Sequence, residues 1–498
     1  MPGRLRATDY DSDFSLERLK GWIRACNKHH GPSCRTWGLM NAPLPTRVLD
    51  VAASRKHVIL VEPGQQKGQY MTLSHRWGGK DVIHTTKATL DARKAGIPLS
   101  DLPRTFINAV TICRRLGVRY LWIDSLCIIQ DSREDWEREA ARMADVYANS
   151  YLTIAASSSP DSSGGCFPSW EARSRTPHQS PETRSMGMPF IGDAAPVRST
   201  AGNRKHTAWL ANHQFVYLNS SWDGQSSRLV IHGEWMPSST RQDPKRFYVG
   251  SFGRRLDPLK DEMLNIRGWT LQERLLSPRT IHYSADQMYW ECERDFLGED
   301  GSVFDPSVFS LNALLERQRL PPPERGFASH GYISFVEGFS TRMERPQGRW
   351  RGGWLGHVQE YSARNLTHAG DKLPALAGLA ALVAKETGDE YLAGLWRSHV
   401  LEDLCWRAYE VDGTWEGLDT GESSGFAWAF PKESVVPVRD ATKLCSVRVV
   451  PSRAPSWSWA KLDGLVRFVP LDFTRIRAVF VSCEVEADGV NPFGKVKG

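Results

Sequence analysis

Apolar and polar positions alternate with two different periods in the first third of the chain. The short, mostly apolar run QYMTLS at residues 69–74 predicts a strand, and the two glycines of HRWGG at residues 75–79 predict a turn after it. Apolar side chains then recur with a helical period from Phe106 to Leu116, which predicts a helix that ends at Gly117.

The alternation of strands and helices continues as far as residue 156. The run RYLWID at residues 119–124 is rich in aromatic and β-branched residues and predicts a strand that is covered on both faces. A helix follows, with Ser132 as its N-cap and an apolar stripe that includes Trp136. YLTIAA at residues 151–156 predicts a further strand. This order predicts an α/β fold in which crossover helices cover a sheet.

Beyond residue 156 the pattern changes. The segment 157–251 is rich in Ser, Arg, Gly and Pro, and we interpret it as an insertion, part linker and part β. Regular structure returns with a short helix at 268–276 and a hairpin that ends near residue 292. The chain is therefore divided into an N-terminal helical segment with Cys and His residues at 1–68, an α/β domain at 69–292 that contains the insertion, and a C-terminal α+β region at 293–498.

The charge of the chain argues against a nucleic-acid partner. Its 63 Lys and Arg residues exceed its 57 Asp and Glu residues, for a formal net charge of +6, and the excess is spread along the sequence. A protein that binds nucleic acid gathers its positive charge in a patch or stripe. We therefore expect no nucleic-acid partner.

The cysteines and the apolar runs point to a soluble protein. The nine cysteines are odd in number and scattered, which indicates reduced thiols rather than a secreted disulfide framework. The first residues are charged where a signal peptide would need an apolar run. The longest apolar stretch, at residues 373–384, is too short to cross a bilayer. We expect a cytoplasmic protein with no membrane span.

A group of metal-ligand residue types follows the predicted N-terminal helix. Cys26, His29, His30 and Cys34 lie close together in the sequence, at a spacing that zinc would permit. The usual zinc signature needs a second Cys/His pair, which the neighbouring sequence lacks. We therefore favour a structured loop with buried thiols and assign no metal ligand, although the zinc alternative stays open.

Candidate chemistry is concentrated at the ends of two predicted strands. His75 and Arg76 follow the first of these strands, and Asp124 and Ser125 follow the second. Ligands of open α/β sheets collect at the carboxyl ends of the strands. If the two strands are neighbours, an imidazole, a guanidinium and a carboxylate face one crevice. In the alternative interpretation, Asp124 caps a turn and Arg76 is a structural cation.

The helix that follows Ser132 carries a further candidate, Glu139. It lies at the border of the apolar stripe, where partial loss of solvent would raise a carboxyl pKa and permit acid–base chemistry. An ordinary solvated helix acid is the alternative. The chain has no phosphate-binding loop, no G-x-G-x-x-G that opens a helix and no G-x-S-x-G elbow. P-loop and α/β-hydrolase chemistry are therefore disfavoured.

Three blocks of the sequence resemble the fungal heterokaryon incompatibility (HET) domain family. They are YMTLSHRWGG at 70–79, the segment from LPRTF to YLTIAA at 102–156, and RGWTLQERLLSPRTIHYSADQMYWEC at 267–292. The family is distantly similar to TIR domains, several of which cleave NAD⁺ with a glutamate on a helix. The resemblance implies a TIR/flavodoxin-like sheet in the 69–292 domain, and the W-x-x-E pattern from Trp136 to Glu139 is similar to a TIR catalytic-helix motif.

The resemblance also implies a function. HET-domain proteins act in non-self recognition and programmed cell death when incompatible cells fuse. A TIR-like NAD⁺ glycohydrolase activity would use NAD⁺ as substrate and would need no resident cofactor. Its catalytic residues would be Glu139, Asp124 and His75, and its binding residues Arg76, Trp77, Gly78 and Ser125.

Two alternatives to this function are retained. One is a non-catalytic death-signalling module that acts by self-association or through an incompatibility partner protein. The other is an enzyme of fungal secondary metabolism that has been repurposed for another small-molecule substrate. Fold-level likeness does not choose among the three.

Overall fold

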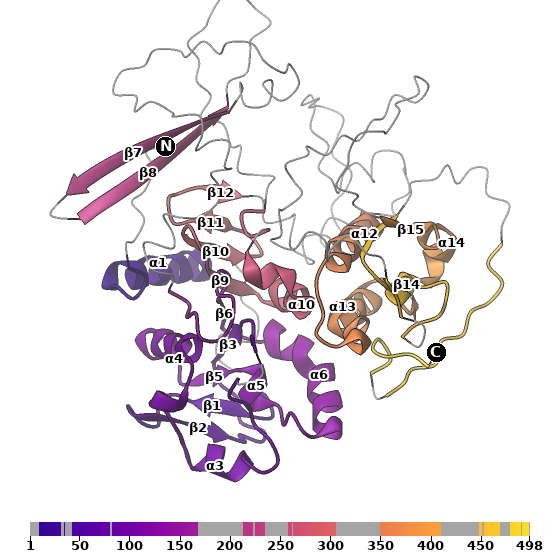
Figure 1. The fold of residues 1–498 in the computed structure, drawn as a ribbon, viewed down its shortest axis with the longest axis horizontal. Coiled ribbons are helices and arrows are strands. Elements are labelled where there is room, and N and C mark those ends of the chain that lie inside the picture. Colours follow the sequence, from indigo (N-terminus) through magenta and orange to yellow (C-terminus); the bar gives the residue numbers. More distant parts are fainter. Residues whose placement is uncertain are drawn as a thin grey trace, which may run out of the picture.

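The computed structural model describes residues 9–30, 34, 42–79, 82–167, 213–222, 225–234, 257–260, 262–304, 349–409, 448–450, 453–468, 479–489 and 491–497. Most of the insertion predicted at 157–251 lies outside these residues. The part that is described includes an antiparallel hairpin of β7 (His213–Trp222) and β8 (Gln225–Glu234) (Figure 1).

A ten-stranded mixed sheet forms the centre of the molecule. In spatial order its strands are β12 (Val303–Phe304), β11 (Phe296–Gly298), β10 (Met288–Cys292), β9 (Arg279–Tyr283), β6 (Leu152–Ala155), β3 (Tyr70–Ser74), β5 (Tyr120–Trp122), β1 (Val48–Asp50), β2 (His57–Val61) and β4 (Ile97–Pro98). The four central strands β9, β6, β3 and β5 are parallel, and the strands that flank them are antiparallel. The predicted α/β class is confirmed at this level.

Helices cover both sides of the sheet. They are α1 (Asp13–His29), α3 (Leu90–Ala95), α4 (Arg104–Leu116), the single turn α5 (Asp124–Cys127), α6 (Arg133–Ala148) and α10 (Trp269–Leu276). In Figure 1, α1 and α4 lie on one side and α6 and α10 on the other. Gly117 ends α4 with a left-handed φ of 74°, and Ser132 caps α6, as the sequence predicts.

The central strands are buried on both faces because these helices cover them. Every residue of β3, β5 and β6 is buried, which explains why the runs lack alternation. Short strands from the first 68 residues extend the same sheet, since β1 pairs with β5. The N-terminal segment therefore contributes to the core of the α/β domain.

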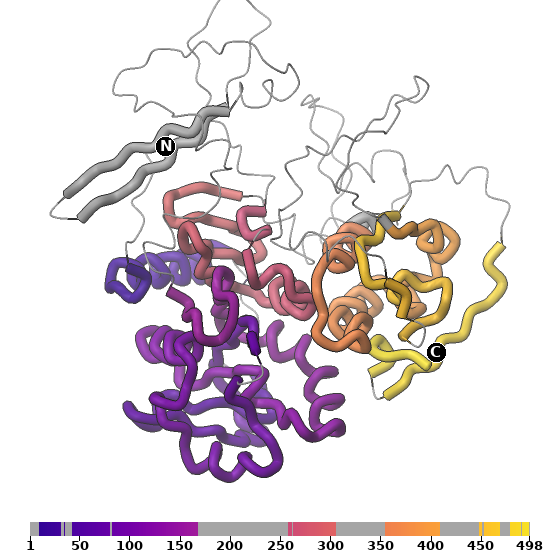
Figure 2. Tube along the Cα trace, viewed as in Figure 1, coloured from indigo at the N-terminus to yellow at the C-terminus, as the bar shows by residue number. Residues whose placement is uncertain are grey.

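The C-terminal residues form a second, smaller mixed part. Its helices and strands are α12 (Arg349–Ser362), α13 (Ala377–Thr387), β13 (Tyr391–Leu392), β14 (Leu395–Trp396), α14 (Val400–Asp403), β15 (Trp406–Tyr409), β16 (Arg448–Val449), β17 (Leu462–Asp463) and β18 (Leu465–Phe468). This part also contains the short 3₁₀ turns η6 (Ala369–Asp371), η7 (Pro374–Leu376), η8 (Arg397–His399) and η10 (Trp459–Lys461). Two further 3₁₀ turns, η2 (Leu99–Asp101) and η4 (Met263–Ile266), lie earlier in the chain. Figure 2 shows this orange and yellow part beside α10.

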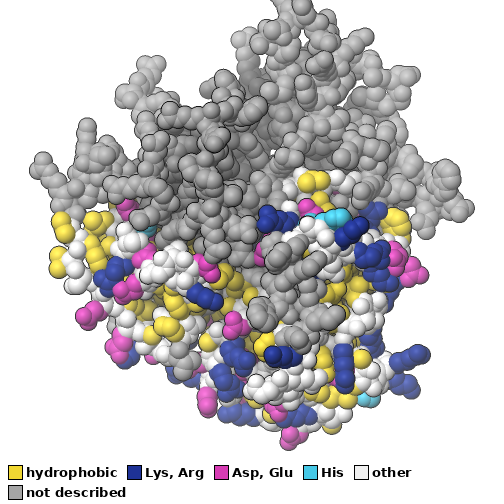
Figure 3. Space-filling model, turned by 180° about the vertical axis from the view of Figure 1, so that it is seen from behind, with side chains coloured by type: hydrophobic (Ala, Val, Ile, Leu, Met, Phe, Trp, Pro, Cys, Tyr) yellow, Lys and Arg dark blue, Asp and Glu magenta, His cyan; other side chains and the backbone are white. Residues whose placement is uncertain are grey.

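The two parts pack together through α6, α10 and α13. A Cβ added to Gly378 of α13 would lie 2.3 Å from the Cβ of Ala144 on α6, so the two helices approach closely at this glycine. On the face shown in Figure 3, basic and acidic side chains are interspersed over the described surface. Among the described residues, no helix is long and apolar enough to cross a membrane.

Candidate functional site

The carboxyl ends of β3 and β5 bring the predicted strand-end residues together. The two strands are parallel neighbours, with Thr72 opposite Trp122. His75 therefore lies beside Asp124, with 3.9 Å between His75 Nδ1 and Asp124 Oδ1. The two strands are thus neighbours, as the sequence analysis required for these residues to meet, and both side chains are buried.

Three donors hold the Asp124 carboxylate in place. The backbone N–H of Ser125 donates to Oδ1 at 2.7 Å, and the indole N–H of Trp77 donates to Oδ2 at 2.8 Å. The guanidinium of Arg267 lies 3.6 Å from Oδ2 and also donates to the His75 carbonyl at 2.7 Å. Both oxygens of this buried carboxylate therefore have partners.

His75 is buried without a hydrogen bond at either ring nitrogen among the described residues. Its ring meets the edge of Phe106, with 4.9 Å between the ring centroids. Burial lowers the pKa of His75 to about 4, so the imidazole is neutral at physiological pH. The Ser125 hydroxyl is likewise buried without a partner in the described part of the chain. Such groups are uncommon in folded proteins and are typical of functional sites.

The structure adds a carboxylate that the sequence analysis did not single out. Glu273 lies on α10 and is 2% exposed. The hydroxyl of Ser74, the last residue of β3, donates to Glu273 Oε2 at 2.5 Å. Burial raises the pKa of Glu273 to about 7, although the charge of the nearby Arg267 lowers it. This acid can therefore gain or lose a proton near neutral pH.

One sequence feature could have pointed to Glu273. It lies in the block RGWTLQERLL, where Gln272, Glu273 and Arg274 stand between leucines in a short helix. Seven of the eight residues of α10 are buried, including Gln272, Glu273 and Arg274. Buried charged side chains need partners of opposite charge or hydrogen-bond partners. For α10 these partners lie in distant parts of the chain, which the local sequence pattern cannot identify.

Glu139 lies outside this cluster. It is 2% exposed on α6, more buried than its place at the border of the apolar stripe suggests. Arg138 Nε donates to its Oε1 at 3.2 Å, and no direct contact among the described residues joins it to His75 or Asp124. Burial raises the pKa of the neighbouring Cys127 thiol to about 12, and the charges of Asp124 and Glu139 add to this effect. Cys127 is therefore no activated nucleophile.

The predicted binding residues Arg76, Trp77 and Gly78 form the turn after β3. Ser162 closes over this turn, since its hydroxyl donates to the Trp77 carbonyl at 3.0 Å. Gly78 has a left-handed φ of 87°, and a Cβ there would lie 2.3 Å from the Cβ of Asp161. The glycine is therefore required by the close approach of the loop 157–167.

A small cavity lies next to the Ser74–Glu273 pair. Its lining consists of Ser74, Thr153, Ala155, Leu264, Asn265, Thr270, Arg274, Thr280 and His282. It has room for about one water molecule, and its walls carry the hydroxyls and charged groups that hold ordered water. The cavity is a place from which a water could reach the carboxyl edge of the sheet.

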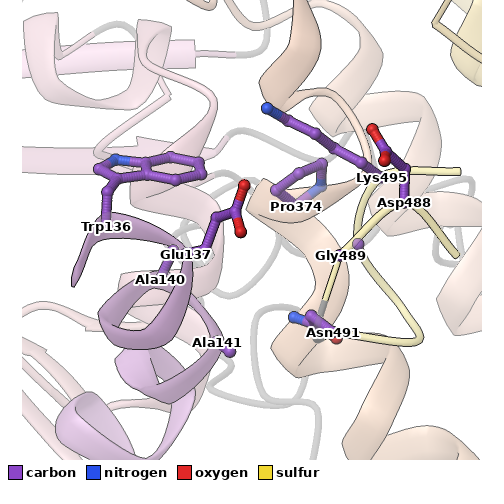
Figure 4. A pocket seen from close by; sticks show the side chains of 10 residues that line it. Trp136, Glu137, Ala140, Ala141, Pro374, Asp488, Gly489, Asn491 and Lys495 are labelled. Carbon is purple, nitrogen blue, oxygen red and sulfur yellow. The ribbon is translucent and has the colours of Figure 1, made fainter. Parts of the chain in front are cut away.

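A second pocket lies between α6 and the C-terminal residues. Figure 4 shows Trp136 and Glu137 of α6 facing Pro374 and the segment that contains Asp488 and Lys495. The ammonium of Lys495 lies 5.4 Å from the centroid of the Trp136 ring. Trp136 therefore contributes to packing between the two parts of the molecule.

Comparison with known proteins identifies the domain that carries this cluster. Residues 70–273 match the family model described as heterokaryon incompatibility protein (HET), a range that begins with β3 and ends at Glu273. No curated protein and no solved structure matches the chain. The matched range contains His75, Asp124 and Arg267 as well, so every charged member of the cluster lies in it. Residues 70–273 are therefore a HET domain, which supports a relation of this protein to heterokaryon incompatibility.

Proposed function

We propose that this protein is a death effector of heterokaryon incompatibility whose HET domain hydrolyses the N-glycosidic bond of NAD⁺. Glu273, rather than Glu139, is the catalytic carboxylate in this proposal. One observation carries it: a buried carboxylate with a pKa of about 7 lies at the carboxyl edge of a parallel sheet, hydrogen-bonded to Ser74.

The strand order supports a ligand site at this edge. Taken in chain order, the four parallel strands β3, β5, β6 and β9 are arranged second, first, third, fourth across the sheet. This is the order of the doubly wound flavodoxin-like sheets, which bind ligands where the strand order reverses, between the first and third strands. In this chain, those strands are β3 and β6, and Ser74 with its partner Glu273 lies at that point.

The side chains of the cluster suit cleavage of a nucleotide glycosidic bond. As the bond to nicotinamide breaks, positive charge develops on the ribose, and a carboxylate beside it stabilises that charge. Water supplies the hydroxyl group of the ADP-ribose product, and the proton released by that water passes to Glu273 before it reaches solvent. Arg76 and Arg267 are the cations available for the pyrophosphate, and the half-buried Trp77 offers a ring for stacking.

A second candidate function is a non-catalytic module that signals by self-association. This candidate is favoured because little space is open at the carboxyl edge of the sheet. The cavity beside Ser74 holds about one water molecule, and the loop 157–167 packs over the turn that contains Trp77. In the enzymatic proposal, this loop has to move before a dinucleotide can enter. Its contacts with the turn include hydrogen bonds from the Ser162 hydroxyl to the carbonyls of Arg76 and Trp77, and the close approach of Asp161 to Gly78.

The test is nicotinamide release from NAD⁺ by the purified full chain, at high protein concentration, for wild type, Glu273→Gln and Glu139→Gln. The proposal expects turnover by wild type and Glu139→Gln and a loss of at least about 100-fold in Glu273→Gln. Cell killing is measured for the same three proteins. Killing by Glu273→Gln without turnover by any protein would support the signalling module. Turnover that only Glu139→Gln abolishes would overturn the assignment of Glu273.

A further inference from the structure

Four metal-ligand side chains from two distant segments of the chain meet at one end of α1. Cys26 lies in the last turn of α1, His30 follows that helix directly, and Cys34 comes shortly after. Cys292, the last residue of β10, completes the group. The ligand atoms of the four residues all lie within 4.8 Å of one another. The neighbouring His29 is exposed and takes no part.

The spacing of the ligand atoms fits a tetrahedral metal ion. His30 Nδ1 lies 3.7 Å from Cys34 Sγ and 3.5 Å from Cys292 Sγ. Zinc bonds of about 2.3 Å to sulfur and about 2.0 Å to nitrogen, at tetrahedral angles, separate S and N by about 3.6 Å. The two separations therefore match what a bound zinc ion imposes on its ligands.

The surroundings of the four residues are those of a metal site. Asp295 Oδ2 lies 3.1 Å from His30 Nε2, so the carboxylate fixes the ring with Nδ1 directed toward the thiols. The backbone N–H of Asp295 also points to Cys292 Sγ at 3.3 Å, which favours a thiolate at that position. A single residue thus orients two of the ligands.

A buried cation faces the cluster from the next strand. Arg279 of β9 is directly opposite Cys292 in the β9–β10 register and is 2% exposed. Its Nη2 donates to the Cys34 carbonyl at 2.9 Å, whereas Nη1 has no hydrogen-bond partner among the described residues. A buried guanidinium needs negative charge nearby. Three thiolates, one neutral histidine and a divalent cation carry one net negative charge, which supplies it.

We propose that Cys26, His30, Cys34 and Cys292 bind one structural Zn²⁺ ion. The three thiols lose their protons to solvent when the ion binds, and the histidine binds in its neutral form. The protein supplies all four ligands, so the ion has no open position for catalysis. Its effect is to fasten α1, His30 and Cys34 to β10 of the ten-stranded sheet. This proposal does not depend on the proposed enzymatic function.

The test is the zinc content of the full chain, purified under reducing conditions without chelator and measured by inductively coupled plasma mass spectrometry. About one zinc ion per chain is expected for wild type and for the control His29→Ala. His30→Ala and Cys292→Ser should fall at least about tenfold in metal content after dialysis. Loading with Co²⁺ should give the visible bands of a tetrahedral thiolate complex in wild type and in His29→Ala.

One conservative variant keeps the test decisive if His30→Ala does not fold. His30→Cys replaces one zinc ligand type with another, so it should fold and retain about one zinc ion per chain. Three results would overturn the proposal: wild type without zinc after incubation with the ion, equal zinc in wild type and His30→Ala, or a disulfide between two of these cysteines in mass spectra of the unreduced protein.

Discussion

The hydroxyl of Ser74 donates a hydrogen bond of 2.5 Å to the carboxylate of Glu273, which lies 199 positions further along the chain. The bond joins the end of the first parallel strand to the helix that precedes the fourth. It places an acid where the strand order reverses, the region in which doubly wound sheets bind ligands. The charge state of Glu273 should therefore affect the stability of the domain and the NAD⁺ hydrolysis that we propose for it.

Replacing Glu273 by Gln should change how stability depends on pH. The pKa of Glu273 is raised by burial from 4.5 to about 7, so the folded state holds this proton more tightly than the unfolded state does. The resulting stabilisation is fully present below about pH 4.5 and is lost as the pH rises through about 7, a change of about 3 kcal/mol. Urea unfolding at pH 5 and pH 8 measures the change.

The glutamine side chain has the same shape and can still accept from Ser74, but it does not titrate. Between pH 5 and pH 8, wild type should thus lose about 2 to 3 kcal/mol more stability than Glu273→Gln does. Equal losses in the two proteins would show that the carboxyl group is not held in its neutral form.

His75 should resist protonation in the folded state, and the stability of the fold should therefore fall at acid pH. Burial lowers its pKa from 6.5 to about 4, so the folded state favours the neutral ring. The stability that this contributes is present above about pH 6.5 and is lost as the pH falls through about 4. NMR titration of the His75 ring protons should give a midpoint near 4. A His75 midpoint above about 6 would contradict the buried, neutral state.

The local pattern of apolar and polar residues could predict the strand-end residues of this site but not Arg267 and Glu273. His75 and Asp124 follow strands whose apolar runs are visible in the sequence, and their juxtaposition needs only that β3 and β5 be neighbours. Glu273 lies on α10 and Arg267 just before that helix, both beyond a long insertion, and no periodicity relates this segment to β3. Buried charges also follow no hydrophobic pattern, because their partners rather than their neighbours determine their burial.

The same reasoning applies to the edges of the sheet and to the thiol cluster. Strands β1 and β2 have three and five residues, too short to give a clear period, so the first 68 residues gave only a helical signal. No second Cys/His pair lies near Cys34 in the sequence. The fourth candidate ligand, Cys292, lies in a strand that approaches α1 only in the folded chain. Long-range pairing of this kind is absent from local sequence.

Gly78 should tolerate no side chain, whereas its neighbour Gly79 should. A methyl group on Gly78 would meet Asp161 at 2.3 Å and occupy a left-handed φ of 87°. At Gly79, a Cβ has nothing within 4 Å. Gly78→Ala should lower the free energy of unfolding by about 2 to 4 kcal/mol, and Gly79→Ala by less than about 0.5 kcal/mol. Chemical denaturation of both variants measures the difference, and equal effects would show that the loop 157–167 does not pack on the turn.

Replacing Arg274 on α10 should lower the free energy of unfolding strongly. Its guanidinium donates to Asp257 at 2.6 and 3.1 Å and to Glu291 at 2.8 and 3.0 Å, and His282 adds a contact of 2.8 Å to Glu291. Arg274→Met keeps much of the apolar volume but leaves two buried carboxylates without their cation. Such a change costs about 3 to 5 kcal/mol. Arg133→Met, which breaks an exposed pair with Glu137, should lower the free energy of unfolding far less, because solvent screens exposed ion pairs.

The pH dependence of Arg274→Met separates loss of charge from loss of packing. Burial raises the pKa of Glu291, but Arg274 and the hydrogen bond from His282 lower it to about 2 in wild type. A depressed pKa gives stability that is present above about pH 4.5 and is lost as the pH falls toward 2. Without Arg274 the pKa of Glu291 should rise, so the deficit of the variant should shrink between pH 7 and pH 4.5 as the carboxylates are protonated. A deficit that is constant across this range would mean that lost packing, not the uncompensated charges, destabilises the variant.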